Sequence, residues 1–318
     1  MTKVFILTTA KETSFNPFAL CNYNYISKIA ELSNSNQHSR VSNVEEAELL
    51  LFISSRAVFK SDILLTDLFR KNYQKSLVLD FHDAPMPSLP GLYMTIPKHL
   101  HDIPIYQYGF YPRVINNNML DLSKPLDNAR YLYSFVGNVS NYKTIREKVI
   151  NLQHPRGFVK DNSSYKTSLE STYVEIMHDS KFILCPRGIS PSSFRVFETM
   201  RSGRVPVIIS DEWYPLIGID WEEFSVRISE KDIHLIPDIL ESLEDKSEMM
   251  GQTAREIWEK KFSLEGGFDW IINTCNYIQS QRDQFSDYIH RNIFFEIVQK
   301  GYTNRYVKEK IKALIGKV

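Results

Sequence analysis

The stretch Ser180–Asp211 reads SKFILCPRGISPSSFRVFETMRSGRVPVIISD and indicates the fold class most clearly. Its apolar run Phe182–Leu184 is too short for a helix and is soon followed by Pro186, so it predicts a buried strand. The loop Arg187–Ser193 is rich in Gly, Pro and Ser, which turn a chain or cap a helix. Apolar residues then recur at helical spacing until Gly203, and a second apolar run follows. Strand, loop, helix and strand in this order predict a βαβ unit of a parallel sheet.

The loop before this helix carries side chains that suit an anion. In parallel sheets, ligands bind where strands end and helices begin, and anions bind at helix N-termini. Arg187 precedes the helix and Arg195 lies in its first turn, and such a pair suits a diphosphate because a guanidinium forks onto two oxygens. Glu198 shares a helix face with Arg195 and could bind two adjacent ribose hydroxyls. The alternative is a weak surface ion pair between Arg195 and Glu198. The residues of this segment that we expect to bind a ligand are Arg187, Gly188, Ser192 or Ser193 as the N-cap, Arg195, Glu198 and Asp211.

These residues also carry a resemblance. CPRG followed by SSFRVFETMRSGRVPVIISD resembles the signature of the exostosin-type glycosyltransferase family. That signature has cysteine-proline-x-glycine, serine-x-arginine with a glutamate three residues on, then glycine, proline-valine-isoleucine and an aspartate. SFVGN with a downstream Arg146, and Trp221 with the run Phe224–Val226, agree with it. The resemblance covers roughly residues 131–240, and the N-terminal third matches only loosely.

The resemblance implies both a fold and an activity. The fold is α/β and GT-B-like, with two Rossmann-like domains that face each other across a cleft. The activity is an inverting transfer of a sugar, typically from a uridine-diphosphate donor, to a glycan or lipid-linked saccharide, as in surface polysaccharide synthesis. We expect residues 1–125 to form an acceptor-side domain and residues 126–262 to form the nucleotide-sugar-binding domain. Residues 263–318 would be helices that cross back to the first domain and end in a basic tail.

The sequence contains no D-x-D triplet, which forms the metal–diphosphate site of the other major glycosyltransferase fold. The charge of the leaving group is therefore expected to fall on Arg187, Arg195 and the helix dipole. On this interpretation the protein needs no metal and no cofactor, and the nucleotide-sugar is its substrate.

Composition excludes several other classes. The chain has 318 residues, and 38 basic side chains balance 38 acidic ones, which argues against nucleic-acid binding. Its three cysteines, Cys21, Cys185 and Cys275, show neither a disulfide framework nor metal spacing, so we expect a reducing compartment. The sequence shows no apolar run of membrane-spanning length and no signal peptide, which predicts a cytoplasmic protein.

Residues 1 to about 120 alternate short apolar runs with helical segments, which predicts a first α/β half. The strand Leu77–Leu79 leads into Asp80, His82 and Asp83 at its carboxyl end. A histidine between two carboxylates could be a general base, because an acidic neighbour raises its basicity and orients the ring. The alternative is a turn in which the acids cap loop amides. A metal site is disfavoured, because three ligands within four residues rarely complete a coordination shell.

The second half opens with the apolar strand Tyr131–Val136, which enters Gly137 and Asn138 before a helix that carries Arg146. Strand, glycine turn and helix predict a second phosphate-facing loop, so Gly137, Asn138 and Arg146 join the expected donor site. The alternative for Gly137 is that it only allows a tight turn. Asp211 could bind hydroxyls of the donor sugar or cap a turn.

The C-terminal tail from Ile293 combines apolar and basic residues. Such a segment could lie on an anionic membrane surface, which would make the protein peripheral on the inner membrane, or it could be a solvated helix docked by its apolar side. Two alternatives to a transferase stay open: a nucleotide-sugar epimerase or hydrolase on a similar fold, and a subunit that binds donor or glycan without turnover. No G-x-G-x-x-G follows a strand and no Walker pattern occurs, which excludes a nicotinamide dehydrogenase and a P-loop enzyme.

Overall fold

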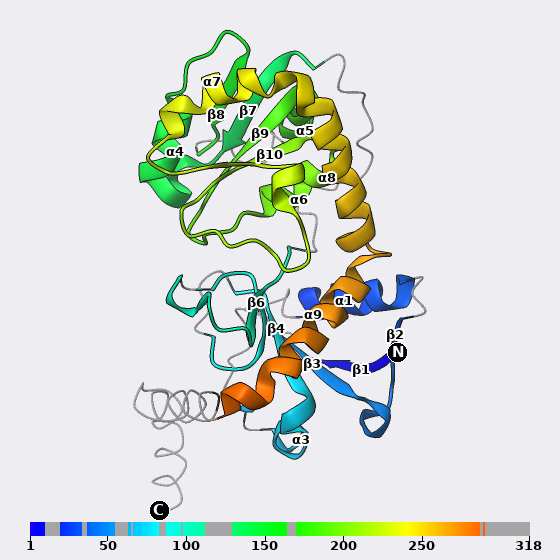
Figure 1. The fold of residues 1–318 in the computed structure, drawn as a ribbon. Coiled ribbons are helices and arrows are strands. Elements are labelled where there is room, and N and C mark those ends of the chain that lie inside the picture. The colour runs from blue at the N-terminus through cyan, green and yellow to red at the C-terminus, as the bar shows by residue number, and fades with distance from the viewer. Residues whose placement is uncertain are drawn as a thin grey trace, which may run out of the picture. The chain divides into compact units, whose positions relative to one another are not determined.

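The computed structural model describes residues 1–9, 20–33, 37–54, 63–64, 66–82, 87–96, 98–111, 129–163, 170–286 and 289. The chain divides into two compact units, which are shown in Figure 1. Unit 1 takes the described residues of Met1–Glu31, Asn36–Gln107 and Ile271–Val318. Unit 2 takes those of Leu32–Ser35 and Tyr108–Trp270.

Unit 1 is built on a sheet with the strand order β2-β1-β3-β4-β5-β6. Neighbouring strands from β2 to β5 pair in parallel. Every residue of β3 is buried, as expected for a strand covered on both faces. β1 lies between β2 and β3 in the sheet. The chain therefore passes from β1 to β2 on one side of β1, and then crosses to β3 on its other side. The strands are β1 (Thr2–Leu7), β2 (His38–Arg40), β3 (Leu49–Ser54), β4 (Ser76–Asp80), β5 (Gly91–Tyr93) and β6 (Tyr106–Tyr108).

Two helical segments of unit 1 lie within ranges that the sequence predicts as helices. Helix α1 (Cys21–Leu32) lies within the expected segment 18–32. The pattern also predicts a helix over Ser61–Asn72 with Ser61 as its N-cap. Within that range Ile63 and Leu64 are helical, and α3 (Asp67–Lys71) follows Thr66, whose hydroxyl accepts the bond from the amide of Phe69. Ser61 itself lies outside the described residues.

Helix α9 (Gly267–Gln281) begins in unit 2 and belongs to unit 1 from Ile271 onward. Its side chains bond to the first strands of the sheet: Asn276 donates to Thr2 Oγ1 at 3.0 Å, and Asn273 lies 3.1 Å from His38 Nε2. Just after the helix, Arg282 donates to the carbonyl of Ser76 at 2.8 Å. The end of the described chain thus completes a unit that its beginning started.

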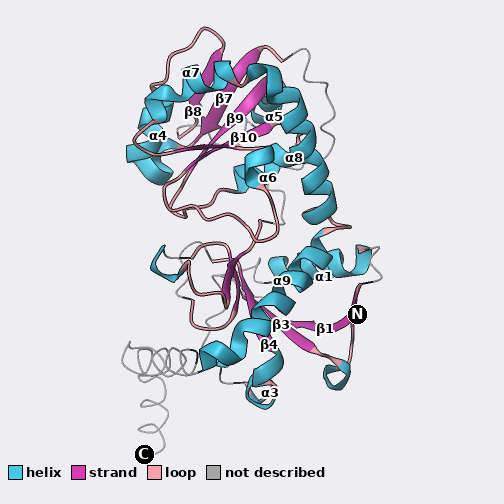
Figure 2. Cartoon of the chain, viewed as in Figure 1, coloured by secondary structure: helices cyan, strands magenta, loops and turns pink. Residues whose placement is uncertain are grey.

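Unit 2 is built on a fully parallel sheet with the order β11-β10-β9-β7-β8, flanked by helices in Figure 2. The predicted βαβ unit is confirmed, and Gly203 after its helix has a φ of 65°, which glycine adopts without strain. The strands are β7 (Tyr131–Gly137), β8 (Gly157–Asp161), β9 (Ser180–Pro186), β10 (Val205–Ile209) and β11 (Val226–Ile228); the helices before α9 are α4 (Lys143–Ile150), α5 (Glu170–His178), α6 (Phe194–Arg201), α7 (Ile236–Ser242) and α8 (Ser247–Lys261).

The core of unit 2 joins the sheet to its helices. Phe135 of β7, Leu184 of β9 and Val207 of β10 are fully buried in one cluster with Val149 of α4 and Ile236 of α7. Truncating one such side chain to alanine typically costs about 2–5 kcal/mol. The predicted α/β class is confirmed, with one sheet of parallel strand pairs in each of two units.

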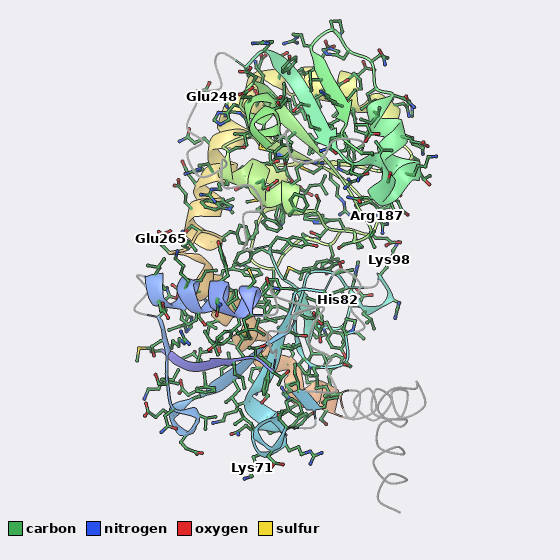
Figure 3. The ribbon with its side chains drawn as sticks, turned by 180° about the vertical axis from the view of Figure 1, so that it is seen from behind. Lys71, His82, Lys98, Arg187, Glu248 and Glu265 are labelled. Carbon is green, nitrogen blue, oxygen red and sulfur yellow. The ribbon has the colours of Figure 1, made fainter. Side chains whose placement is uncertain are left out.

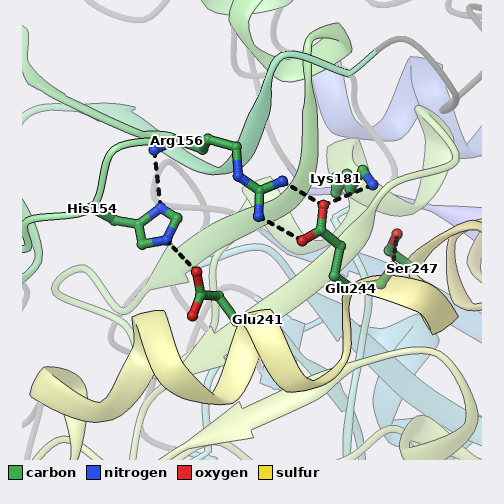
Figure 4. Close-up of polar contacts among 6 residues, drawn as sticks. All are labelled: His154, Arg156, Lys181, Glu241, Glu244 and Ser247. Carbon is green, nitrogen blue, oxygen red and sulfur yellow. Dashed lines mark hydrogen bonds and ion pairs between the residues drawn. The ribbon is translucent and has the colours of Figure 1, made fainter.

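The amino ends of the strands of unit 2 carry a group of ion pairs, shown in Figure 4 and called here the amino-end cluster: His154, Arg156, Lys181, Glu241 and Glu244. Arg156 bonds both oxygens of Glu244 at 2.6 Å, and Lys181 bonds one of them at 2.9 Å. His154 Nε2 lies 2.9 Å from Glu241 Oε1. These bonds lower the pKa of Glu244 to about 2, the one from Arg156 most strongly.

No helix within the described ranges is both long enough and apolar enough to span a lipid bilayer. The basic tail from Ile293 lies outside the described residues, so its two interpretations stay predictions.

Candidate functional site

The candidate site lies at the carboxyl ends of β7 and β9, which are neighbours in the sheet of unit 2. The chain leaves β7 toward β8 on one side, and it leaves β9 toward β10 on the other. Such a reversal of direction is the topological switch point at which open α/β sheets bind ligands. Gly137 and Asn138 stand at the end of β7, and Arg187 directly follows β9. The sheet order therefore brings two of the predicted ligand-binding segments side by side.

Arg195 reaches from α6 back to the end of β7. Ser193 is the N-cap of the helix, and its hydroxyl accepts a bond from the backbone amide of Arg195. The Arg195 guanidinium lies 4.6 Å from the ring centre of Phe135 and donates through Nη2 to the carbonyl of Val136 at 2.7 Å. Its Nη1 is buried and has no hydrogen-bond partner among the described residues. A buried N–H without a partner is costly, so this atom calls for an explanation.

Gly137 is required by space as well as by the turn. A Cβ at this position would lie 2.8 Å from Nη2 of Arg195 and 2.8 Å from the ring of Phe135. Any larger residue would therefore displace the guanidinium.

Glu198 is held by a tyrosine that the sequence patterns did not single out. Its carboxylate is only 4% exposed and accepts a bond of 2.7 Å from the hydroxyl of Tyr173 on α5. The Nε of Arg195 donates to the same tyrosine oxygen at 3.3 Å. Burial raises the pKa of Glu198 to about 7, although the Tyr173 bond and the charges of Arg195 and Arg201 oppose the rise. The interpretation of Arg195 and Glu198 as a surface ion pair is wrong, because both side chains are buried.

Arg187 is also buried, at 7% exposure. Its Nη1 lies 3.2 Å from Glu212 and 3.5 Å from Glu230, and its guanidinium lies 4.6 Å from the ring centre of Tyr142. Its Nε is buried without a partner. Figure 3 labels this arginine among the side chains of unit 2. Two carboxylates thus occupy one edge of the guanidinium while another N–H is left unpaired.

Arg146 uses its guanidinium on the backbone. It donates to the carbonyls of Arg187 at 2.9 Å, Asn138 at 2.7 Å and Pro186 at 3.4 Å. Burial, followed by the charge of Arg195, lowers its pKa to about 10. The sequence predicts Arg146 as a donor-binding residue, whereas these contacts join the ends of β7 and β9 to each other.

The remaining predicted residues of unit 2 lie around this edge. Asn138 caps the turn after β7 by accepting from the amide of Ser140 at 2.8 Å, and Gly188 would place a Cβ 3.4 Å from Arg146. Ser192 is buried, and its amide donates to Ser190 Oγ.

Asp211 is exposed and takes part in a reciprocal pair of bonds. Its carboxylate accepts from the amide of Glu230 at 3.0 Å, and its own amide donates to the Glu230 carboxylate at 3.2 Å. This geometry matches the turn-capping alternative for Asp211.

In unit 1, Asp80 is 2% exposed at the end of β4 and accepts a 2.9 Å bond from the backbone amide of His82. This is the amide-capping arrangement that was the alternative to a general base. The His82 side chain is partly exposed, as labelled in Figure 3. Asp83 lies outside the described residues. In the part of the chain that the structure describes, no cluster of three or more His, Cys, Asp or Glu side chains could hold a metal ion.

The sequence patterns missed Tyr173, Tyr142, Glu212 and Glu230. Glu212 carried a signal, because it directly follows Asp211 in a loop at the same sheet edge. Tyr173 carried none, since it lies in a helix more than twenty residues before the residues that it contacts.

Comparison with known proteins identifies the domain that contains this site. Residues 98–243 match the Exostosin GT47 domain. An Exostosin-1 homolog of Caenorhabditis elegans is 33% identical over 143 residues, which are 44% of this chain and 32% of that protein. Exostosin-1b of Danio rerio is 35% identical over 125 residues, which are 38% of this chain and 16% of that protein. The match thus spans a third or less of the length of these curated relatives.

Solved structures show only a distant likeness. TarM has a TM-score of 0.38 at 14% identity over 82% of this chain and 58% of that chain. Anabaena HepE in complex with UDP has a TM-score of 0.38 at 8% identity over 89% of this chain and 100% of that chain. The family therefore rests on the sequence match and not on these structures. Residues 98–243 of the chain are thus similar to the exostosin-type glycosyltransferase family.

Proposed function

We propose that the chain is an inverting glycosyltransferase that moves a sugar from a nucleotide-diphosphate donor, UDP-linked, to a hydroxyl of a glycan or lipid-linked saccharide. The observation that carries the proposal is the buried set Arg187, Arg195 and Glu198 at the switch point of unit 2. This set lies within residues 98–243, which match the Exostosin GT47 domain. Synthesis of a surface polysaccharide is the process that such a reaction would serve.

The two arginines have the donors that a diphosphate needs. Nε of Arg187 and Nη1 of Arg195 are buried without a partner in the part of the chain that the structure describes. Phosphate oxygens at these positions would accept charge-assisted hydrogen bonds, which are stronger than neutral ones. The first turn of α6 adds the positive end of its dipole. Glu198 would accept the ribose hydroxyls on the same face of that helix.

The reaction is a single displacement. The acceptor oxygen attacks the anomeric carbon opposite the diphosphate, the bond from that carbon to the diphosphate oxygen breaks, and its electron pair leaves with UDP. Attack from the opposite face inverts the anomeric centre. The arginines and the helix dipole would stabilise the charge of the leaving UDP, so we propose that no metal or cofactor is required.

The proton of the acceptor hydroxyl must pass to a base. His82, Asp80 and Asp83 of unit 1 stay the candidates, and imidazole is the group whose ordinary pKa suits this transfer near neutral pH. We further propose a cytoplasmic protein whose basic tail contacts the anionic inner membrane surface. Sedimentation with vesicles of phosphatidylserine and phosphatidylcholine, compared with phosphatidylcholine alone, tests that contact.

The test of donor binding is a thermal-shift screen against nucleoside diphosphates and their sugars. A ligand at one hundred times its Kd stabilises the folded chain by about 2.7 kcal/mol, which is readily measured as a rise in Tm. We expect UDP and a UDP-sugar to raise Tm more than other nucleotides do. If no nucleotide raises Tm, the proposal is wrong.

Turnover separates the alternatives. A transferase forms product only when an acceptor is present, and its activity survives EDTA. An epimerase or hydrolase would consume the donor incubated alone. A binding subunit would show the thermal shift but form no product with any acceptor. Loss of activity with EDTA that manganese restores would contradict the metal-free mechanism.

A further inference from the structure

The hydroxyl of Tyr173 lies between the two side chains of α6 that the proposed function uses. Tyr173 comes from α5, outside the loop and helix that carry the other site residues. Its oxygen lies 2.7 Å from Glu198 Oε2 and 3.3 Å from Arg195 Nε, and its ring centre lies 5.6 Å from the Arg195 guanidinium carbon.

The chemistry of the three groups fixes the direction of these bonds. A guanidinium can only donate, so Arg195 donates to the tyrosine oxygen. The single hydroxyl proton is then left for the carboxylate, which accepts it. Tyr173 therefore orients Arg195 and Glu198 at the same time, although the two side chains share no direct hydrogen bond among the described contacts.

We infer that Tyr173 is a positioning residue that holds Glu198 and Arg195 in the orientation in which they bind the ribose and the diphosphate of the donor. This inference rests on the proposed function, and it adds a residue from a different helix to the donor site. The tyrosine itself need not touch the nucleotide.

The groups around Glu198 make the inference testable through pH. Tyr173 faces the carboxylate from α5, Arg195 and Arg201 from α6, and Cys185 from β9. Burial raises the pKa of Glu198 to about 7, and the Tyr173 bond is the strongest influence that lowers it. Removing the hydroxyl should therefore move the pKa of Glu198 further upward. A neutral carboxyl is a poorer acceptor for ribose hydroxyls, so donor affinity should fall with it.

The experiment measures UDP binding by titration calorimetry between pH 5.5 and 8.5 for the unaltered chain, Tyr173→Phe and Glu198→Gln. The unaltered chain should bind UDP more tightly as pH rises through about 7, where Glu198 ionises. Tyr173→Phe should bind about tenfold more weakly at neutral pH and move the midpoint of the profile to higher pH. Glu198→Gln should bind weakly with a flat profile. Tyr173→Gln, which keeps an N–H donor, should recover part of the lost affinity.

Tyr133→Phe is the matched control. Tyr133 is a buried tyrosine of β7 in the same unit, and its hydroxyl has no hydrogen-bond partner. Its removal should leave UDP affinity and the pH profile unchanged. Far-ultraviolet circular dichroism checks that each variant folds.

The outcomes separate the inference from the function on which it rests. If UDP binds and Tyr173→Phe reproduces the profile of the unaltered chain, the role of Tyr173 is wrong while the proposed function stands. If UDP does not bind the unaltered chain, the proposed function falls, and the role of Tyr173 in donor binding falls with it. If neither Tyr173→Phe nor Tyr173→Gln folds, the tyrosine serves stability, and the positioning role is overturned.

Discussion

The two ends of the sheet in unit 2 use the same kinds of side chain in opposite ways. At the amino ends of the strands, Arg156 bonds both oxygens of Glu244, and Lys181 adds a further bond. At the carboxyl ends, Arg187 and Arg195 are buried with N–H groups that no protein atom accepts. Charges that satisfy one another contribute to folding, whereas buried donors without partners are suited to a ligand. Arg156 and Arg195 therefore differ in the pairing of their N–H groups and not in residue type.

The largest effect on UDP affinity should come from replacing an arginine at the carboxyl ends of the strands, compared with replacing one at their amino ends. Arg195→Ala removes charge-assisted donors, so UDP affinity should fall about a hundredfold, equivalent to about 3 kcal/mol. Arg156→Ala is the matched control and should lower Tm slightly without changing UDP affinity, because an exposed ion pair contributes about 1 kcal/mol or less. Titration calorimetry and thermal melting read the two effects separately. Equal UDP affinities in the two variants would remove the distinction between the ends.

The two carboxylates should give opposite slopes of stability against pH. The pKa of Glu198 is raised from 4.5 to about 7, so the unfolded chain releases this proton first. The free energy of unfolding should therefore fall between these values, by up to about 3 kcal/mol, and then level off. The pKa of Glu244 is lowered to about 2, so its contribution is complete above pH 4.5 and is lost as pH falls toward 2.

Urea unfolding at a series of pH values checks these slopes. Glu198→Gln should abolish the fall between pH 4.5 and 7, and Glu244→Gln should reduce the loss in acid. A Glu198→Gln variant that keeps the fall would show that other groups cause it.

A smaller effect should follow from adding one methyl group beside Arg195. Gly137→Ala places a Cβ 2.8 Å from Nη2 of that arginine, so the guanidinium must move. We expect about tenfold weaker UDP binding, because a displaced hydrogen bond to a charged group costs about 1.5 kcal/mol. The control is Gly188→Ala, whose Cβ would lie 3.4 Å from Arg146, near ordinary van der Waals distance. If both variants bind UDP alike, the position of Arg195 does not matter to the ligand.

The smallest effect should be a gain in UDP affinity. Glu212 is 47% exposed and pairs with Arg187 at 3.2 Å, so a diphosphate must compete with it. Glu212→Gln should tighten UDP binding about threefold and weaken the dependence of binding on salt, since a rim charge contributes less than 1 kcal/mol. Glu222→Gln, at an exposed acid of the same unit, serves as the control. Weaker UDP binding in Glu212→Gln would instead indicate that Glu212 orients Arg187 for the ligand.

Local sequence patterns were sufficient to predict the strands, the helix and the helix cap around the candidate site. Apolar periodicity located β9, α6 and β10, and a serine before the helix predicted its N-cap, which is Ser193. The placement of Arg187 and Arg195 at one sheet edge followed from the rules for parallel sheets.

Sequence patterns did not predict the hydrogen-bond partners of the charged side chains. Arg146 carries the residue type of a phosphate ligand, yet backbone carbonyls from two strands take up its donors. Tyr173 contacts Glu198 across 25 positions of sequence, and no motif specifies such a contact.

The division of the chain has a consequence for its synthesis. Unit 1 needs α9, whose Asn276 bonds Thr2 at the opposite end of the chain. A ribosome that adds 5–20 residues per second needs on the order of ten seconds to pass from Gln107 to Ile271. During that interval the strands of unit 1 have been synthesised but most of α9 has not, because the ribosome is translating unit 2. Chaperones that shield apolar strands would therefore meet the strands of residues 1–107 before those of unit 2.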